Sequence, residues 1–276
     1  TISHLGYIKR TPLADFRQQG RGGVGSKASA TRDEDFVEYV HTASMHSTMM
    51  FFTEQGQVFW LKVYELPEGN KASKGRAIQN MVNIQKGDKV RAFINVKGLN
   101  DEAFVNSHYL VFLTKNGLIK KTSLEQYSRP RTNGIIAIDL RDGDELIRVQ
   151  MTDGQSEILV ASQQGKVVRF SEETVRAMGR DTSGVRGITL EETNDAAIGM
   201  VCVQKGSEES ILVVSSKGYG KRTRLDDENG EPIYRITNRG GKGVKTMALT
   251  DKTGDLVAIE AVTDDNDLML INKSGT

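Results

Sequence analysis

The stretch Leu110-Val111-Phe112-Leu113-Thr114-Lys115-Asn116-Gly117 decides the fold, because its pattern recurs along the chain. The pattern is an apolar block, a polar residue, two variable residues and a glycine. Its polar-x-x-Gly part occurs six times in the 276 residues, and five copies follow a block of four apolar residues. The copies lie at residues 3–6, 53–56, 114–117, 162–165, 215–218 and 272–275. Their glycines are 50, 61, 48, 53 and 57 residues apart, a spacing typical of propellers and other arrays of supersecondary units.

Each repeat predicts four short strands. The apolar block is typical of a strand buried on both faces, and the turn after it needs glycine for a positive φ. The chain returns in a mixed strand, such as residues 118–121, and a polar connector leads to a second glycine, 17 to 25 residues beyond the first. Two further strands follow, such as residues 135–138 and 146–149. Four strands are the content of one propeller blade. The second glycines are Gly25, Gly75, Gly134, Gly184 and Gly243.

We therefore expect one all-β domain over residues 1–276, with repeats near residues 6–55, 56–116, 117–164, 165–217 and 218–274. Helix is expected only as single turns near residues 13–17 and 172–178. The chain enters inside one repeat and stops directly after the turn glycine of another. This predicts a fragment of a longer polypeptide, with five nearly complete units and a sixth, truncated one.

Composition narrows the class of protein. Apolar residues make up 37% and charged residues 26% of the chain, which is typical of an ordinary soluble protein. No apolar run approaches the roughly 20 residues that span a bilayer, and no secretory signal opens the chain. The one cysteine, Cys202, lies in an apolar stretch and is expected to be a buried small hydrophobe. These features favour a cytoplasmic location.

The net charge of +1 hides a sorting of charges along the repeat. Residues 109–134 carry five cations against one carboxylate, whereas residues 139–157 carry six carboxylates against two cations. Residues 251–267 carry six carboxylates against one cation. Radial stacking of the repeats would bring such segments together as a basic and an acidic face.

Cations recur at equivalent positions of the repeats. Four residues after the turn glycine stand Arg10, Trp60, Lys121, Arg169 and Arg222, and Lys9, Lys120 and Lys221 precede three of these. The connectors and the strands after them add Lys71, Lys74, Arg76, Arg129, Arg131, Arg176, Arg180 and Arg186. We expect these side chains to line a rim, which would suit a continuous polyanion because each neutralised phosphate releases counterions. The alternative is that outward-facing cations only provide solubility and protect strand edges.

A glycine-rich basic loop occurs twice, and both copies end at the second glycine of a repeat. The first spans residues 18–27 and includes Gln19, Arg21, Gly22, Gly23 and Gly25. The second spans residues 237–245 and includes Arg239, Gly240, Gly241, Lys242 and Gly243. Glycines let backbone N–H groups approach phosphates closely, and arginine offers a bidentate contact. A merely mobile loop is the alternative.

With Gly6-Tyr7-Ile8-Lys9-Arg10 and Gly218-Tyr219-Gly220-Lys221-Arg222, these loops resemble one family, the C-terminal domains of bacterial DNA gyrase A proteins. The resemblance covers essentially the whole chain. It implies a six-bladed β-pinwheel, a propeller relative in which strands are exchanged between blades, with the last blade truncated here. Its basic perimeter would wrap duplex DNA with a positive handedness.

The resemblance also assigns the first loop to the family's GyrA box. Gln19, Arg21, Gly22, Gly23 and Gly25 match it, whereas Gly20 and Val24 stand where the family usually has basic residues. The loop would keep its backbone shape and lose up to two phosphate contacts. The hypothesis that follows is that the Arg239 loop takes over part of this work.

The implied function is that of a non-catalytic, DNA-wrapping domain of a type IIA topoisomerase. The wrap would direct strand passage and introduce negative supercoils, while cleavage and ATP use belong elsewhere in the enzyme. The implied partners are double-stranded DNA, the gyrase A N-terminal domain and gyrase B in an A2B2 holoenzyme, with the fragment itself monomeric. No catalytic residue and no cofactor is expected. The scattered His4, His41, His46 and His108 predict no metal site.

Two alternatives stay open. The first is the corresponding domain of topoisomerase IV, which resembles this fold but lacks the box. The second is a propeller that serves as a protein-interaction scaffold. Trp60, which replaces a cation in its repeat, would then be the contact residue, although packing between blades is the favoured interpretation of this side chain.

Overall fold

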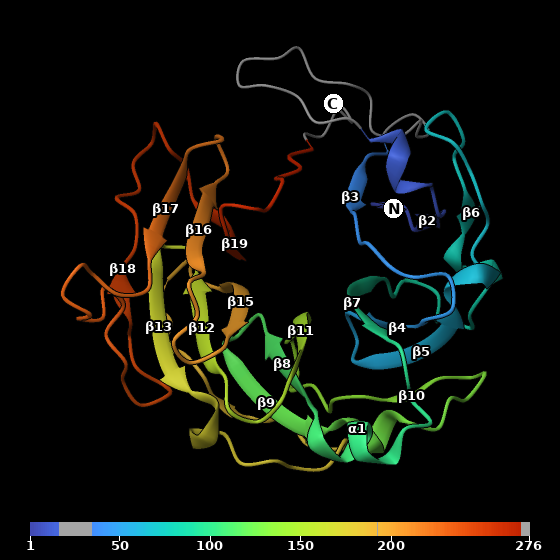
Figure 1. Ribbon diagram of the computed structural model, residues 1–276, viewed down its shortest axis with the longest axis horizontal. Coiled ribbons are helices and arrows are strands. Elements are labelled where there is room, and N and C mark those ends of the chain that lie inside the picture. The colour runs from blue at the N-terminus through green and yellow to red at the C-terminus, as the bar shows by residue number, and fades with distance from the viewer. Residues whose placement is uncertain (17–34, 192, 272–276) are drawn as a thin grey trace.

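The polar-x-x-Gly sequence closes a β-hairpin in each of five repeats. The computed structural model describes residues 1–16, 35–191 and 193–271. In it the apolar blocks and return strands pair antiparallel, and the hairpins are arranged around a common centre (Figure 1). The hairpin strands are β1 (Ile2–Ser3) and β2 (Tyr7–Ile8), β4 (Thr48–Thr53) and β5 (Gln57–Lys62), β8 (Tyr109–Thr114) and β9 (Leu118–Ser123), β12 (Glu157–Ser162) and β13 (Lys166–Ser171), and β16 (Ser210–Ser215) and β17 (Gly220–Arg224).

The first residue of each turn is Ser or Thr for a structural reason. In the third hairpin the Thr114 hydroxyl accepts the N–H of Leu118 at 3.2 Å, and its carbonyl accepts the N–H of Gly117 at 3.0 Å. The same two bonds occur in the other four hairpins. Gly117 has φ +82°, in the left-handed region that other residues rarely adopt. The recurring sequence is therefore a self-capped turn.

A recurrent aspartate also closes the turn, and the sequence analysis missed it. The Asp144 carboxylate accepts the backbone N–H groups of Asn116 at 2.9 Å and Glu145 at 2.8 Å. Three further hairpins hold an aspartate in the same way, namely Asp35, Asp88 and Asp195. Part of the charge sorting along the sequence thus reflects turn carboxylates rather than an acidic surface, since Asp144 is only 9% exposed.

Two kinds of strand flank each hairpin. An inner strand pairs with the apolar strand of each hairpin, and inner strands of successive blades contact one another. These strands are β3 (Val37–Tyr39), β7 (Val90–Val96), β11 (Leu146–Thr152), β15 (Ala197–Val203) and β19 (Leu256–Val262). The outermost strand is β6 (Arg76–Ala77), β10 (Ile135–Ile136), β14 (Val185–Arg186) or β18 (Val244–Lys245), each supplied by the following repeat. The implied exchange of strands between blades is confirmed.

The second glycine of the repeat permits this exchange. Gly184 has φ +92°, and a Cβ placed on it would lie 2.4 Å from the carbonyl oxygen of Ile119 in the preceding blade. A Cβ placed on Gly75 or Gly243 would come similarly close to the return strand of the preceding blade, at the carbonyl oxygens of Ile8 and Val167. Only glycine allows the connector to approach that backbone.

The expectation of six blades is not matched. The described residues form five sheets, of which four have four strands and the last, β17-β16-β19, has three. The sixth apolar block, residues 268–271, forms no strand, and its Leu268 and Leu270 are 56% and 67% exposed. In the other repeats the apolar block pairs with a return strand beyond the turn, and no such strand follows this block among the described residues.

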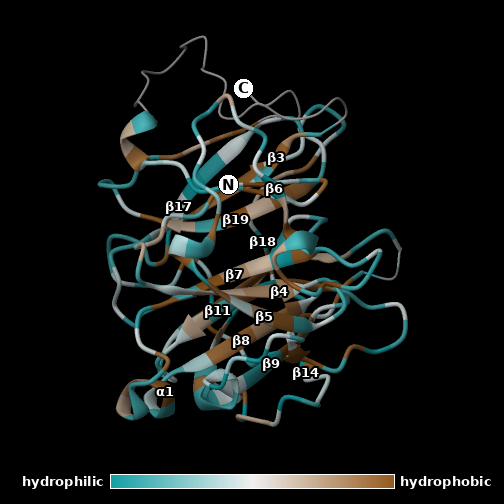
Figure 2. Ribbon diagram, turned by 90° about the vertical axis from the view of Figure 1, so that its right-hand side faces the viewer, coloured by the Kyte–Doolittle hydropathy of each residue, from teal (hydrophilic) through white to brown (hydrophobic). Residues whose placement is uncertain are grey.

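The hydrophobic core lies between adjacent sheets rather than at one centre. Met50 and Phe52 of β4 face the third blade, whereas Met49 and Phe51 of the same strand face the first. Four such clusters join the five sheets. The prediction of strands buried on both faces is confirmed, and Figure 2 shows the apolar residues concentrated along these strands.

Helix is scarce, as expected. The predicted turns appear as the shorter 3-10 segments η1 (Leu13–Asp15) and η5 (Glu172–Thr174). A helix that the sequence analysis missed, α1 (Glu102–Ser107), lies in the longest repeat and is capped by the Asp101 carboxylate, which accepts the Phe104 N–H at 3.1 Å. The other 3-10 turns are η2 (Val63–Glu65), η3 (Ile78–Asn80) and η4 (Leu124–Tyr127). No helix in the described part of the chain is long and apolar enough to cross a membrane.

Candidate nucleic-acid interface

The connector that supplies each outermost strand also covers the return strand of the preceding blade. Parallel bridges join Arg10 to Glu68, Lys121 to Ala177, and Arg169 to Ile236. The residue four positions after the turn glycine therefore lies beneath the next repeat's connector. This arrangement decides which of the predicted rim cations reach solvent.

Two lysines of the return strands are buried beneath these connectors. Lys120 is 0% and Lys9 is 3% exposed. The Lys120 ammonium donates to the carbonyl oxygens of Ala137, at 2.7 Å, and Arg180, and so ties two successive connectors together. Lys9 donates in the same way to Asn70 and Ser73, both at 2.8 Å. Burial lowers the pKa of both lysines, that of Lys120 to about 7.

Lys121 and Arg169 are buried as well, at 7% and 4% exposure. Arg169 binds the Glu157 carboxylate through Nε at 2.7 Å, and its Nη1 donates to the carbonyls of Leu225 and Tyr234 at 3.2 Å. Lys121 lies 3.8 Å from the fully buried Glu172. The prediction that Lys9, Lys120, Lys121 and Arg169 line an exposed rim is wrong. The connector of the next repeat covers these side chains, and their charged groups bind carbonyl or carboxylate oxygens.

Arg10 is intermediate between a buried and an exposed cation. Its Nη1 lies 2.6 Å from the Glu68 carboxylate, its Nε donates to the Leu66 carbonyl, and its side chain is 25% exposed. The predicted contact of Arg10 with DNA stays a prediction.

The last blade differs, since no following connector covers it among the described residues. Lys221 and Arg222 are exposed, although they occupy the positions of the buried Lys120 and Lys121. Lys221 donates to the Thr246 carbonyl at 2.8 Å, and Arg222 pairs with the 91%-exposed Asp264 at 2.6 Å.

The connector cations form the exposed basic set. They lie in or beside the outermost strands, and β6, β10 and β18 mark this perimeter in Figure 1. Only Arg129 pairs with a carboxylate among the described residues, at 3.7 Å from Glu125. Lys71 and Arg180 are half-buried, Lys71 lying over the Phe16 ring. The exposed members are Lys74, Arg76, Arg129, Arg131, Arg176, Arg186, Arg239 and Lys242.

The exposed cations that sequence reasoning missed in the later repeats include Arg141, Arg224, Arg235 and Lys245. Lys245 could have been found, because it stands two residues after Gly243, as Arg186 stands two residues after Gly184. Arg141 carries no comparable local signal. It belongs to the loop between β10 and β11, whose place beside the next repeat only the fold reveals.

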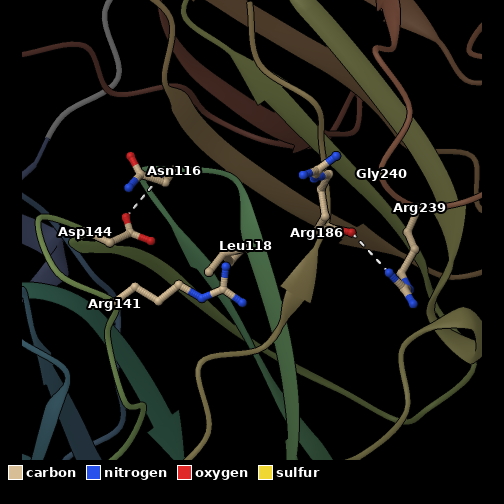
Figure 3. A pocket seen from close by; sticks show the side chains of 7 residues that line it. All are labelled: Asn116, Leu118, Arg141, Asp144, Arg186, Arg239 and Gly240. Carbon is tan, nitrogen blue, oxygen red and sulfur yellow. Dashed lines mark hydrogen bonds between the residues drawn. The ribbon is translucent and has the colours of Figure 1, made fainter. Parts of the chain in front are cut away.

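A surface pocket of about 600 Å³ lies where the third and fourth blades meet. Three arginines line it, Arg141, Arg186 and Arg239, together with Leu118, Gly240, Asn116 and Asp144. Figure 3 shows Arg141 extending below Leu118, with Arg186 and Arg239 on the other side of the pocket. Asp144 points to the Asn116 backbone, whose N–H it accepts. The geometry suits a bound anion.

Three further expectations have different outcomes. The first glycine-rich loop, with Gln19, Arg21, Gly22, Gly23 and Gly25, lies outside the described residues, so its role stays a prediction. Trp60 packs against the core cluster between the second and third blades, which confirms the packing interpretation. Cys202 is half-buried beside another core cluster, and burial raises the pKa of its thiol. The described residues contain no cluster of three His, Cys, Asp or Glu side chains that could hold a metal ion.

Comparison with known families adds independent information. The family model described as DNA gyrase C-terminal domain, beta-propeller, matches residues 1–44, 47–97, 108–153, 156–204 and 209–263. The chain is 42% identical over 275 residues to the DNA gyrase A protein of Staphylococcus epidermidis strain ATCC 12228. It is equally similar to the gyrase A protein of Staphylococcus aureus strain NCTC 8325. Each alignment covers 100% of this chain and 30% of the relative, so the chain spans about a third of these proteins.

Solved structures show the same fold. A DNA gyrase A C-terminal domain superposes with a TM-score of 0.78 at 24% identity, covering 96% of this chain and 82% of the other. The C-terminal domain of a DNA topoisomerase IV superposes with a TM-score of 0.70 at 23% identity, covering 95% and 76%.

Proposed function

The chain belongs to the DNA gyrase C-terminal, beta-propeller family, and on this premise we propose that it binds duplex DNA along its perimeter and bends it into a wrap. One observation carries the proposal: exposed cations of successive connectors lie at the outermost strands, and nearly all lack a carboxylate partner among the described residues. A duplex following the perimeter would meet one connector after another.

The physical basis is phosphate neutralisation. Bending 20–30 base pairs through 40–90° costs on the order of 1–6 kcal/mol, so a wrap needs many favourable contacts. Lys and Arg side chains on a stiff ring of blades provide such contacts without reading base sequence. The buried cations of the return strands contribute indirectly, because Lys120 and Arg169 hold the connectors that present the exposed ones.

The wrap would set the direction of strand passage in a larger enzyme. In this proposal the chain is a non-catalytic part of an ATP-dependent type IIA topoisomerase, joined to a gyrase A N-terminal domain and to gyrase B in an A2B2 assembly in the cytoplasm. The wrapped duplex crosses the cleaved segment with a fixed handedness, so strand passage introduces negative supercoils. Cleavage and ATP hydrolysis belong to the other parts, and the chain itself acts as a monomer without a cofactor.

A DNA topology assay tests the proposal. The chain is bound to relaxed plasmid in the presence of a nicking–closing enzyme, and the linking number is measured after protein removal. We expect constrained positive writhe, and duplex affinity that falls steeply with salt. Unchanged linking number together with salt-independent affinity would contradict wrapping.

The first glycine-rich loop is tested in the assembled enzyme. Replacing Arg21, Gly22 and Gly23 with alanine should impair supercoiling more than relaxation, and neutral substitutions at Arg239 and Lys242 should deepen that defect. Equal loss of both activities would argue against a wrapping role for the first loop. No added effect of the second pair would exclude compensation by the second loop.

The alternatives receive less support. The fold is close to that of both gyrase and topoisomerase IV domains, but the 42% identity is to gyrase A proteins. The proposal of a protein-interaction scaffold relied on Trp60 as the contact residue, and Trp60 packs against the core instead. The sign of the constrained writhe separates the gyrase function from both alternatives.

A further inference from the structure

We propose that the pocket formed by Arg141, Arg186 and Arg239, here named the three-arginine pocket, binds one backbone phosphodiester of the duplex and anchors it at this point of the perimeter. The inference rests on the proposed function and deepens it. A basic rim alone would hold DNA about equally at every blade, whereas a built pocket fixes the position of the duplex on the ring.

The pocket is assembled from three successive repeats. Arg141 lies seven residues after Gly134, Arg186 two residues after Gly184, and Arg239 four residues before Gly243. Gly240, with φ +82°, donates its N–H to the Gly187 carbonyl at 2.7 Å and so holds the last connector against β14. The three arginines line one pocket only because the outermost strand is exchanged.

The charge of the pocket favours an anion. Arg141 and Arg186 have no carboxylate partner among the described residues. Arg239 donates to the carbonyls of Thr174, at 3.1 Å, and Arg186, at 3.4 Å, which fixes its side chain and leaves further N–H donors free. The Asp144 carboxylate is buried and accepts two backbone N–H groups. The lining of the pocket therefore carries three exposed arginines and one buried carboxylate.

The neighbouring seam supplies a natural comparison. The corresponding residues at the seam between the second and third blades are Gln85, Ile136 and Arg180. Gln85 matches Arg141 because its carbonyl accepts the N–H of the turn aspartate Asp88 at 3.1 Å, as that of Arg141 accepts the N–H of Asp144 at 3.0 Å. Arg180 donates to the Ile136 carbonyl at 2.8 Å, just as Arg239 donates to that of Arg186. Ile136 is 54% exposed and Gln85 is exposed and neutral, so this seam keeps the framework and lacks two of the three charges. The neighbouring seam thus does not share this concentration of arginines.

Phosphate chemistry explains the choice of arginine. A guanidinium presents N–H donors in a fork that matches two phosphate oxygens, and such charge-assisted bonds are about twice as strong as neutral ones. Leu118, which also lines the pocket, suits the apolar edge of a sugar. A phosphodiester seated here receives contacts from three repeats at once.

The test compares salt dependence of duplex binding for four forms of this chain: wild type, Arg141→Gln/Arg186→Gln, Lys86→Gln/Lys97→Gln and Ile136→Arg. Lys86 and Lys97 are exposed cations outside the perimeter set, so the control removes the same charge. We expect the arginine pair to weaken binding roughly tenfold or more and to reduce the salt slope by about one, because both side chains serve the same phosphate. The lysine pair should leave the slope unchanged, and Ile136→Arg should steepen it by about one.

Equal behaviour of the arginine and lysine pairs, at unchanged melting temperature, would overturn the inference while leaving DNA binding intact. Absence of salt-dependent duplex binding in the wild type would instead contradict the proposed function. Inorganic phosphate at constant ionic strength distinguishes the source of the anion. If phosphate binds the wild type and not the arginine-pair variant, yet does not compete with the duplex, the pocket is a free-phosphate site and the anchor is excluded; displacement of the duplex from the wild type alone supports the anchor.

Discussion

The third and fourth blades use their cations differently from the last blade. Lys120 and Arg169 are 0% and 4% exposed, whereas Lys221 and Arg222 occupy the equivalent positions and are exposed. The local sequences are alike, Lys-Lys, Val-Arg and Lys-Arg, three and four residues after the turn glycine. The difference comes from the next repeat, whose connector covers the third and fourth blades and supplies their acceptors.

The comparison shows that the connector of the next repeat, and not the motif itself, buries these cations. Under a connector, a cation cross-links carbonyl and carboxylate groups of two repeats, because a buried charge is tolerated only when it is paired. Where no connector lies over them among the described residues, Lys221 and Arg222 are exposed, and their partners are the Thr246 carbonyl and the exposed Asp264. The four predictions below test this division, from the largest expected effect to the smallest.

The first test, with the largest expected effect, replaces Arg169 and Arg222 with alanine in separate variants. Arg169→Ala should destabilise the chain by about 3–5 kcal/mol, because it leaves Glu157 buried and unpaired. Arg222→Ala removes an exposed pair with Asp264 and should cost less than about 1 kcal/mol. Urea unfolding of both variants measures the two costs. Similar losses would break the distinction between covered and uncovered blades.

The second test addresses the connector glycine. Gly184→Ala puts a side chain on a left-handed backbone and places its Cβ 2.4 Å from the Ile119 carbonyl oxygen. Together these effects should lower the free energy of unfolding by about 2–4 kcal/mol. Gly218→Ala in the last hairpin has φ +81° and no neighbour within 4 Å, so only the backbone cost of about 1–2 kcal/mol applies. Thermal unfolding should rank Gly184→Ala as the less stable variant, and the reverse order would contradict close approach by the connector.

The third test uses pH. The folded chain holds the pKa of Lys120 at about 7, below the value of 10.5 in an unfolded chain, so the unfolded state binds more protons between these values. Stability should therefore rise with pH through this window. From pH 7 to 9 the free energy of unfolding of the wild type should rise by up to about 2 kcal/mol more than that of Lys120→Met. Parallel pH profiles of the two proteins would show that this ammonium is not desolvated.

The smallest structural effect is expected for an exposed connector cation. Arg131→Gln should leave the melting temperature unchanged, since Arg131 has no carboxylate partner in the described ranges. It should reduce the salt slope of duplex binding by about one. A clear loss of stability without any change in slope would assign Arg131 to structure rather than to DNA contact.

Much of the fold was predictable because its signals are local. The Ser or Thr hydroxyl, the turn glycine and the return strand lie within five residues of one another, as Thr114, Gly117 and Leu118 illustrate. Continuous apolar blocks correctly indicated strands packed on both faces. The turn aspartates escaped notice because Asp144 lies 28 residues from the turn that it closes. The six-bladed form implied by the resemblance was wrong for the described residues, where block 268–271 has no strand to pair with.

The site was predictable only in its outer part. Cations of the connectors, such as Arg176 and Lys242, reach the surface as expected, and those of the covered return strands do not. Sequence by itself determined the repeat, the hairpins and the positions of the charges along the chain, since each depends on neighbouring residues. Tertiary structure decided which charges face solvent, because Lys120 is covered by a carbonyl 60 residues away and three repeats must meet to place Arg141, Arg186 and Arg239 together. Burial is a property of the assembled sheets, and no single repeat contains it.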